Sequence, residues 1–149
     1  PVDPYYLNFI AEKNNIELKT ILSGRKVNNS MKYFILREIK KKIKKLLKNN
    51  VSPKILICGI TYKNNVSDTR NSISLEIFNK LKKEFNNIFA FDNACNLSIK
   101  KKFKILSTIK DVSTYHLIVF LVNHKENKEI FGKAKINIVE IYDPFHFFN

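Results

Sequence analysis

One short segment of the sequence carries residues suited to binding a phosphorylated ligand that contains a ring. An apolar run at 54–59 ends on Gly59, the pair Tyr62–Lys63 follows it, and Arg70 stands just before a helical pattern. The Tyr62 ring can stack on a base, the Lys63 ammonium can meet a phosphate as a point charge, and the Arg70 guanidinium can hold a second phosphate as a fork. Strand, glycine turn and helix is also the order in which nucleotide-binding folds begin.

The connection between this strand and the helix allows two interpretations. It runs for about a dozen residues from Gly59 to Ser72, a length typical of functional loops. It follows the carboxyl end of a strand, where open α/β sheets bind ligands. Alternatively, Tyr62 packs on the sheet edge and Asp68 pairs with Arg70 on the surface. Spacing alone does not decide between the two.

The same loop does not fit a dinucleotide. A dinucleotide-binding turn needs three closely spaced glycines, for the tight turn, for close approach of the pyrophosphate and for helix packing. The chain contains only Gly24, Gly59 and Gly132, which are far apart. No such fingerprint therefore exists in this sequence.

The segments around the loop predict an α/β fold. Expected strands cover 54–59, 87–91, 117–122 and 137–142, and expected helices cover 72–85 and 108–112. Ser72 is the expected N-cap of the first of these helices, whose core-facing residues are Ile73, Ile77, Leu81 and Phe85. Alternating strands and helices imply a parallel sheet with right-handed crossovers. We therefore predict a Rossmann-like three-layer fold.

Residues 1–50 predict a helical segment that precedes the sheet domain at 51–149, with Pro53 marking the boundary. Asp3 and Pro4 fit the start of a helix, with Asp3 as N-cap. The stretch at 18–48 is amphipathic, although Gly24 should weaken it locally. Its apolar face is larger than one small domain needs to cover, so we predict a homodimer through this helix. The residues behind that expectation are Ile35, Ile39, Ile43 and Leu46.

The formal net charge of +14 raises the possibility of nucleic-acid binding. Only Arg25, Arg37 and Arg70 are arginines, however, and nucleic-acid recognition usually relies on the arginine fork. The lysines at 40–48 alternate with an apolar helical face, which indicates a solvated surface. We therefore expect no nucleic-acid partner. No apolar run approaches the roughly 20 residues of a membrane helix, so no membrane partner is expected either.

The cysteines and histidines do not predict a metal or disulfide site. Cys58 falls inside an apolar strand and Cys95 in a polar loop, and neither has metal-ligand spacing. Three histidines are scattered next to predicted strands, at His116, His124 and His146. Without a disulfide framework, the cytoplasm is the expected location.

Three separated motifs resemble the UDP-glucose/GDP-mannose dehydrogenase family, in the same order along the chain. "GITYKNNVSDTRNS" is similar to the start of that family's C-terminal domain, with glycine, an aromatic–lysine pair and D-x-R-x-S. "GRKVNNSM" resembles its central helix. "PVDPYYL" resembles the segment just after its catalytic cysteine, in the form typical of members acting on UDP-N-acetylmannosamine or UDP-N-acetylglucosamine.

The resemblance implies an NAD-dependent enzyme that oxidises the C6 alcohol of a UDP-sugar to a carboxylate through a cysteine thioester. Two Rossmann-like domains flank a dimerising central helix in this family. The resemblance places NAD mainly on an N-terminal domain that this sequence lacks, and leaves the UDP-sugar site to the part present. It also implies a fragment, inactive alone, because the cysteine position would lie upstream of Pro1.

The resemblance also implies roles for individual residues. Asp3 falls on a catalytic aspartate that positions or activates the hydrolytic water, Tyr62 and Lys63 on the substrate-binding pair, and Arg70 on an arginine that reaches NAD. One position departs from the family pattern, because Asp143 is followed by Pro144 rather than by the usual D-x-R-N. The alternative is a basic α/β module that binds nucleic acid or a protein partner without catalysis.

Overall fold

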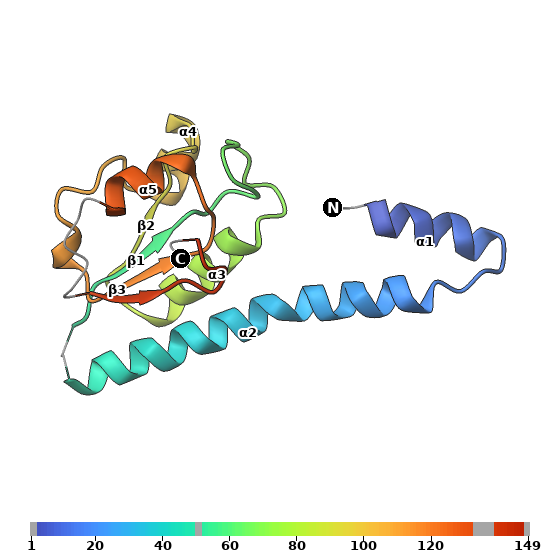
Figure 1. Cartoon of the computed structure of the whole chain (residues 1–149), viewed down its shortest axis with the longest axis horizontal. Helices are drawn as coiled ribbons and strands as arrows, with labels where there is room; N and C mark the ends of the chain where they lie inside the picture. Colours follow the sequence, from blue (N-terminus) through green and yellow to red (C-terminus); the bar gives the residue numbers. More distant parts are fainter. Residues whose placement is uncertain (1–2, 50–51, 133–138, 148–149) are drawn as a thin grey trace. The chain divides into compact units, whose positions relative to one another are not determined.

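The computed structural model describes residues 3–49, 52–132 and 139–147. The chain divides into two compact units, Pro1–Ile35 and Leu36–Asn149. The division falls inside a long helix rather than at the sequence boundary near residue 50, because buried residues of the helix's second half, such as Ile39 and Ile43, belong with the sheet domain. Figure 1 labels the helices and strands.

The N-terminal unit consists of helix α1 (Asp3–Lys13) and the first part of α2 (Lys19–Asn49). Asp3 is the first residue inside α1 rather than the residue before it. There its carboxylate lies in the first turn, where negative charge is favourable. Helix α2 continues without a break through Gly24, since one glycine costs only about 1 kcal/mol in a helix interior.

The C-terminal unit is built on a parallel sheet, as expected. Its strands are β1 (Ile55–Cys58), β2 (Ile88–Phe91), β3 (Leu117–Phe120) and β4 (Glu140–Tyr142). Their order is β2-β1-β3-β4, and every neighbouring pair is parallel. The strands are short apolar runs, fully buried in β1 and β3, as is typical of a sheet covered on both faces.

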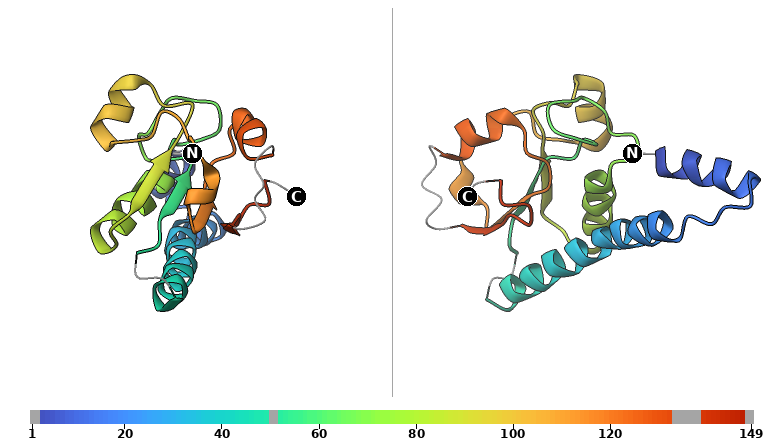
Figure 2. Two further views of the ribbon diagram at one scale, coloured as in Figure 1. Left: turned by 90° about the vertical axis from the view of Figure 1, so that its left-hand side faces the viewer. Right: turned by 45° about the vertical axis from the view of Figure 1, so that its right-hand side comes forward.

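Helices cover both faces of the sheet, which confirms the three-layer prediction (Figure 2). On one face Leu56 and Phe120 pack in a core cluster with Phe131 of α5 (Lys125–Gly132) and Val112 of the 3₁₀ helix η1 (Val112–Thr114). On the other face lie α3 (Ile73–Glu84) and the second half of α2. Ion pairs join α2 to its neighbours, from Lys40 to Glu84 of α3 and from Lys42 to Glu140 of β4.

Helix α3 begins where the sequence predicts. The Ser72 hydroxyl accepts a hydrogen bond from the Leu75 N–H at 3.1 Å, so Ser72 is the N-cap. The expected core face is wrong at Ile73, which is 40% exposed. It is correct at Ile77 and Leu81, whereas Phe85 is the C-cap that follows the helix. The other buried residues of α3 are Ser74, Leu75 and Phe78.

Three elements were not placed correctly by the sequence. The helix expected at 108–112 is the 3₁₀ helix η1, whose start is set by the Asp111 carboxylate accepting from the Ser113 N–H. Helices α4 (Leu97–Phe103) and α5 were not expected at all. Helix α4 buries none of its residues, so it has no apolar stripe for a pattern search to detect.

Candidate functional site: the loop after the first strand

The candidate site is the loop from Gly59 to Ser72, which leaves the carboxyl end of β1 between the ends of β2 and β3. Figure 1 shows this loop in green beside α3. Gly59 has φ +87°, and a Cβ at this position would lie 2.5 Å from the Cβ of Val122. The glycine therefore permits a close approach of two strand ends, rather than the approach of a pyrophosphate.

Asp92, the residue after β2, holds the start of the loop. Its Oδ2 accepts hydrogen bonds from the N–H groups of Ile60 at 2.7 Å and Thr61 at 3.1 Å. The Asp92 side chain is fully buried. Burial alone raises the pKa of its carboxyl, but the hydrogen bonds from His124, Ile60 and Thr61 together outweigh it and hold the pKa below its ordinary value. Asp92 is therefore a buried carboxylate.

His124, which follows β3, holds the loop further along. Its Nδ1 accepts a hydrogen bond from the Asn65 N–H at 3.0 Å. Its Nε2 lies 3.1 Å from Asp92 Oδ2 and 3.2 Å from Thr61 Oγ1. Asp92, His124 and Thr61 are all fully buried, so the carboxyl ends of three strands meet in one polar cluster under the loop.

Further bonds fix the rest of the loop. The Ser72 hydroxyl lies 2.7 Å from the Ile60 carbonyl oxygen. The Asn65 carboxamide oxygen accepts from the Lys125 N–H at the start of α5, and the Ser67 hydroxyl accepts from the Asn96 N–H at the start of α4. The loop is thus attached to every element that surrounds it.

The predicted substrate-binding pair lies at the exposed turn of this held loop. Tyr62 is 42% exposed and Lys63 is exposed, so both side chains reach the surface. The backbone beneath them is fixed, since the Tyr62 N–H donates to the Asp68 carbonyl at 2.7 Å and the Thr61 hydroxyl donates to the Lys63 carbonyl at 3.2 Å. The arrangement presents a phenol ring and an ammonium side by side to solvent.

Arg70 lies on the same loop and forms an ion pair. Its Nη2 donates to Asp68 Oδ2 at 2.8 Å and its Nε to Asp68 Oδ1 at 3.1 Å. The hydrogen bonds from Arg70 lower the pKa of the Asp68 carboxyl to about 2. The surface pairing that the sequence allowed is therefore present, while the Arg70 side chain remains 87% exposed and open to a second anion.

Asp3 belongs to the other unit, where it is exposed in the first turn of α1. The structure therefore gathers Tyr62, Lys63 and Arg70 on one loop, and describes Asp3 separately. Among the described residues, no group of three His, Cys, Asp or Glu side chains has the arrangement of a metal site. No helix in the described part of the chain is long and apolar enough to cross a membrane.

Neither cysteine is a nucleophile in this structure. Burial raises the pKa of Cys58 well above its ordinary value. Cys95 is also buried, although its loop is polar, and burial with the nearby Asp92 carboxylate raises the pKa of its thiol to about 12. Both side chains are therefore thiols at neutral pH, whereas covalent catalysis requires a thiolate.

The residues of this unit do not fit NAD as a complete binding site. Val122 occupies the space beside Gly59 that a pyrophosphate would need, so the backbone at this turn forms no pyrophosphate cradle. Dinucleotide-binding folds use an acidic residue after the second strand to bind a ribose. The corresponding Asp92 is buried and points at the loop backbone instead.

Sequence reasoning did not identify Asp92, His124 or Thr61 as part of the site. They are 31 to 63 residues apart, and each is an ordinary polar residue in isolation. A signal was present nonetheless, because Asp92 and His124 each follow an apolar strand run. The carboxyl ends of neighbouring parallel strands lie at one edge of the sheet, which brings such residues together.

Comparison with known proteins agrees with this fold. Residues 56–145 match the family described as the UDP-glucose/GDP-mannose dehydrogenase family, UDP binding domain. The match covers more than half of the chain, and the chain belongs to this family. The match spans nearly the whole sheet, the helices from α3 to α5 and the loop at Tyr62–Lys63, whereas α2 lies outside it.

Several similar proteins are sugar-nucleotide dehydrogenases. A UDP-N-acetyl-D-mannosamine dehydrogenase of Methanocaldococcus jannaschii is 34% identical over 135 residues, 91% of this chain and 29% of that protein. A UDP-N-acetyl-D-glucosamine 6-dehydrogenase of Salmonella typhi is 28% identical, over 90% of this chain and 34% of that protein. The structure of the UDP-N-acetyl-mannosamine dehydrogenase Cap5O from Staphylococcus aureus superposes with a TM-score of 0.63 and 25% identity, covering 95% of this chain and 32% of that one. The chain thus spans about a third of the length of the curated relatives that it matches.

Proposed function

We propose that this chain is the UDP-sugar-binding part of an NAD-dependent UDP-N-acetylhexosamine 6-dehydrogenase that works in nucleotide-sugar and polysaccharide biosynthesis in the cytoplasm. The observation that carries the proposal is the loop at 59–72, which is held by buried bonds and presents Tyr62 and Lys63 to solvent. Membership of the family and the names of its relatives support the substrate class.

Three side chains of the loop, and Asp3 of the other unit, have roles in this proposal. Lys63 binds a phosphate oxygen of the UDP group by a charge-assisted hydrogen bond, and Tyr62 packs against a ring of the ligand. Arg70 reaches toward NAD, and its ion pair with Asp68 holds the guanidinium in position for that contact. Asp3 helps to position or activate the hydrolytic water, acting as a base through its carboxylate.

The oxidation itself needs parts that this chain does not supply. NAD accepts hydride when it is bound, and the residues described here do not form its pyrophosphate cradle. No thiolate is available for a thioester, because both cysteines are buried thiols. We therefore propose that NAD and the catalytic cysteine lie on a further part of a longer protein, consistent with relatives about three times as long.

The binding proposal is tested by calorimetry of this chain with UDP. Lys63→Ala should weaken UDP binding by on the order of 1–3 kcal/mol, the value of a hydrogen bond to a charged group. Lys44→Ala removes an equally exposed lysine from α2 and is the matched control. Equal affinities for wild type and Lys63→Ala would refute the assignment of this loop. Binding that favours DNA and falls steeply with salt would instead support the basic-module alternative.

The catalytic part of the proposal has its own test. This chain alone should produce no NADH from UDP-N-acetylmannosamine or UDP-N-acetylglucosamine, whereas a protein that also carries the NAD domain should. In that longer protein Asp3→Asn should lower kcat and leave KM nearly unchanged, because a neutral amide cannot act as a base. NADH production by this chain alone would contradict the division of roles.

We also propose a homodimer through the central helix, on different residues from those first expected. Ile39 and Ile43 are buried within the C-terminal unit, so they cannot form the interface. Most of the exposed large apolar residues of α2 lie earlier in the helix and include Val27, Met31 and Phe34. Light scattering at tens of micromolar should show a dimer, and Met31→Lys together with Phe34→Lys should convert it to a monomer.

A further inference from the structure

The buried cluster of Asp92, His124 and Thr61 is a feature that UDP recognition does not by itself require. All three side chains are fully buried, so none of them can touch a ligand that lies on the exposed loop. Buried polar groups need partners, and here most of the partners are backbone groups of that loop. The cluster is therefore directed at the loop.

The bonding pattern defines where the His124 proton lies. The Asn65 N–H can only donate, so His124 Nδ1 accepts and carries no proton. The neutral ring then has its proton on Nε2, between Asp92 Oδ2 and Thr61 Oγ1. Thr61 uses its own hydroxyl proton toward the Lys63 carbonyl, so its oxygen is able to accept. Only one placement of the protons gives every group in this set of hydrogen bonds a partner.

The two anchors lie on either side of the ligand-facing pair. Asp92 fixes the N–H groups of Ile60 and Thr61, just before Tyr62. His124 fixes the N–H of Asn65, two residues after Lys63. The Nε2–H bond joins the two anchors, so that the strand ends of β2 and β3 hold one short piece of backbone between them.

We propose that Asp92 and neutral His124 are positioning residues that set the loop at Tyr62–Lys63 for the UDP group of the substrate. The identity of the ligand rests on the function proposed above, whereas the anchoring of the loop does not. Preorganisation of this kind raises affinity because the loop loses less conformational freedom on binding. His124 acts through the Asn65 N–H, and Asp92 through the N–H groups of Ile60 and Thr61.

Two substitutions at His124 separate its two bonds. His124→Asn keeps an acceptor near the Nδ1 position, so it should retain the Asn65 anchor while losing the bond to Asp92. His124→Gln keeps a donor near the Nε2 position, so it should retain the bond to Asp92 while losing the Asn65 anchor. We expect UDP affinity to fall about fivefold in His124→Gln, the loss of one hydrogen bond, and to stay within about twofold in His124→Asn.

Amide hydrogen exchange supplies a measurement that does not depend on the ligand. The Asn65 amide should exchange faster in His124→Gln than in His124→Asn, while those of Ile60 and Thr61 stay protected in His124→Gln. His116→Gln is the matched control, since His116 Nδ1 also accepts a backbone N–H, that of Lys54 at 3.0 Å, at the opposite edge of the sheet. It should expose the Lys54 amide and leave UDP affinity unchanged.

Wild-type spectra test the proposal without any variant. The ¹⁵N shifts of the His124 ring should report a proton on Nε2 and none on Nδ1. A proton on Nδ1, or equal Asn65 exchange and equal UDP affinity in the two His124 variants, overturns the proposal. If wild type does not bind UDP, the proposed function fails, and the exchange and ¹⁵N results still decide whether the loop is anchored in this way.

Discussion

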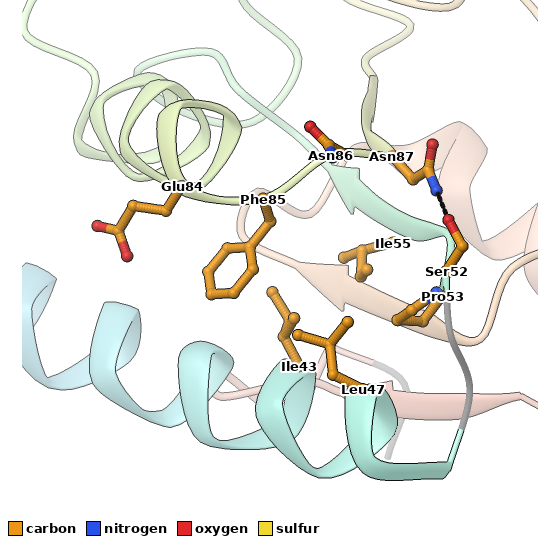
Figure 3. Close-up of a pocket in the computed structure, with 9 residues that line it drawn as sticks. All are labelled: Ile43, Leu47, Ser52, Pro53, Ile55, Glu84, Phe85, Asn86 and Asn87. Carbon is orange, nitrogen blue, oxygen red and sulfur yellow. Dashed lines mark hydrogen bonds between the residues drawn. The ribbon is translucent and has the colours of Figure 1, made fainter.

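The carboxyl and amino edges of the sheet are closed by contacts of different chemistry. At the carboxyl edge, buried Asp92 and His124 bond to the backbone of the loop after β1. At the amino edge lies a small hollow of about 210 Å³. Figure 3 shows Ile43 of α2, Ile55 of β1 and Phe85, the residue after α3, among the side chains that line it. There too a histidine, His116, accepts a backbone N–H.

The difference is in what each edge leaves for a ligand. At the amino edge, apolar side chains such as Ile43, Ile55 and Phe85 line the hollow, and apolar contacts are non-directional and tolerate small shifts. The carboxyl edge is closed by hydrogen bonds to a buried carboxylate, which fix direction as well as distance. A directional frame is what a binding loop needs, so the carboxyl edge should be the less tolerant of substitution.

Gly59→Ala should show the largest effect. It places a Cβ within 2.7 Å of three Val122 atoms and forces a positive φ on a residue with a side chain. We expect a loss of about 3 kcal/mol or more in the free energy of unfolding, measured by urea denaturation. Gly132→Ala, which meets no atom within 4 Å, is the control and should change stability by less than about 1 kcal/mol. Equal losses in the free energy of unfolding for Gly59→Ala and Gly132→Ala would contradict the expectation that the carboxyl edge is less tolerant of substitution.

Asp92→Asn should come next, with a pH dependence that identifies its cause. The folded pKa of Asp92 is lowered, so its stabilisation is present above the unfolded pKa near 4 and is lost as the pH falls through the folded value. We expect a loss of about 2 kcal/mol at pH 7. The gap between wild type and Asp92→Asn should narrow as the pH is lowered below about 4. A gap that does not change with pH would mean that Asp92 is not ionised in the fold.

Leu47→Ala at the amino edge should have a smaller effect. Leu47 lines the hollow and is 43% exposed, so truncation removes only part of a buried side chain (Figure 3). We expect a loss of about 1 kcal/mol in the free energy of unfolding and no change in UDP affinity. Weakened UDP binding in this variant would show that the two edges are coupled, and would break the contrast drawn between them.

Arg70→Gln should have the smallest effect on the fold, since its side chain is almost fully exposed. Its signature is local. Without the guanidinium, the pKa of the Asp68 carboxyl should rise from about 2 toward 3.8, as followed by NMR titration of the carboxyl carbon. Lys82→Gln on α3 removes another cation and should leave the Asp68 pKa where it was. An unchanged pKa in Arg70→Gln would show that the pair does not persist in solution.

Local signals were enough to predict the sheet and α3. Four apolar runs and one serine cap mark elements whose sequence pattern and tertiary environment agree. Helix α4 was missed because Leu97–Phe103 is short, rich in lysine and buries nothing, so its only signal is the Asn96 cap. The end of the last strand could be foreseen, although the part of that prediction at 137–138 lies outside the described residues.

The loop residues of the site could be predicted from the sequence, whereas the buried residues that hold the loop could not. Tyr62, Lys63 and Arg70 stand close together in the sequence, so spacing alone suggests a ligand loop. Asp92 and His124 join that loop only after parallel pairing brings three strand ends together, a non-local event that no window of sequence records. The homodimer prediction shows the same limit, because its Ile39 and Ile43 proved to be covered by their own domain.

The main chain makes many of the hydrogen bonds that hold the first part of the loop. The hydrogen bonds of residues 60–63 use N–H and C=O groups together with the Thr61 hydroxyl, and the bond from Asn65 to His124 uses an N–H. Side chains at 62, 63, 64 and 66 are exposed and take no part in those bonds. These four positions can therefore change identity while the frame persists. Selection, or a laboratory library, can alter what the protein prefers to bind here without first having to repair its stability.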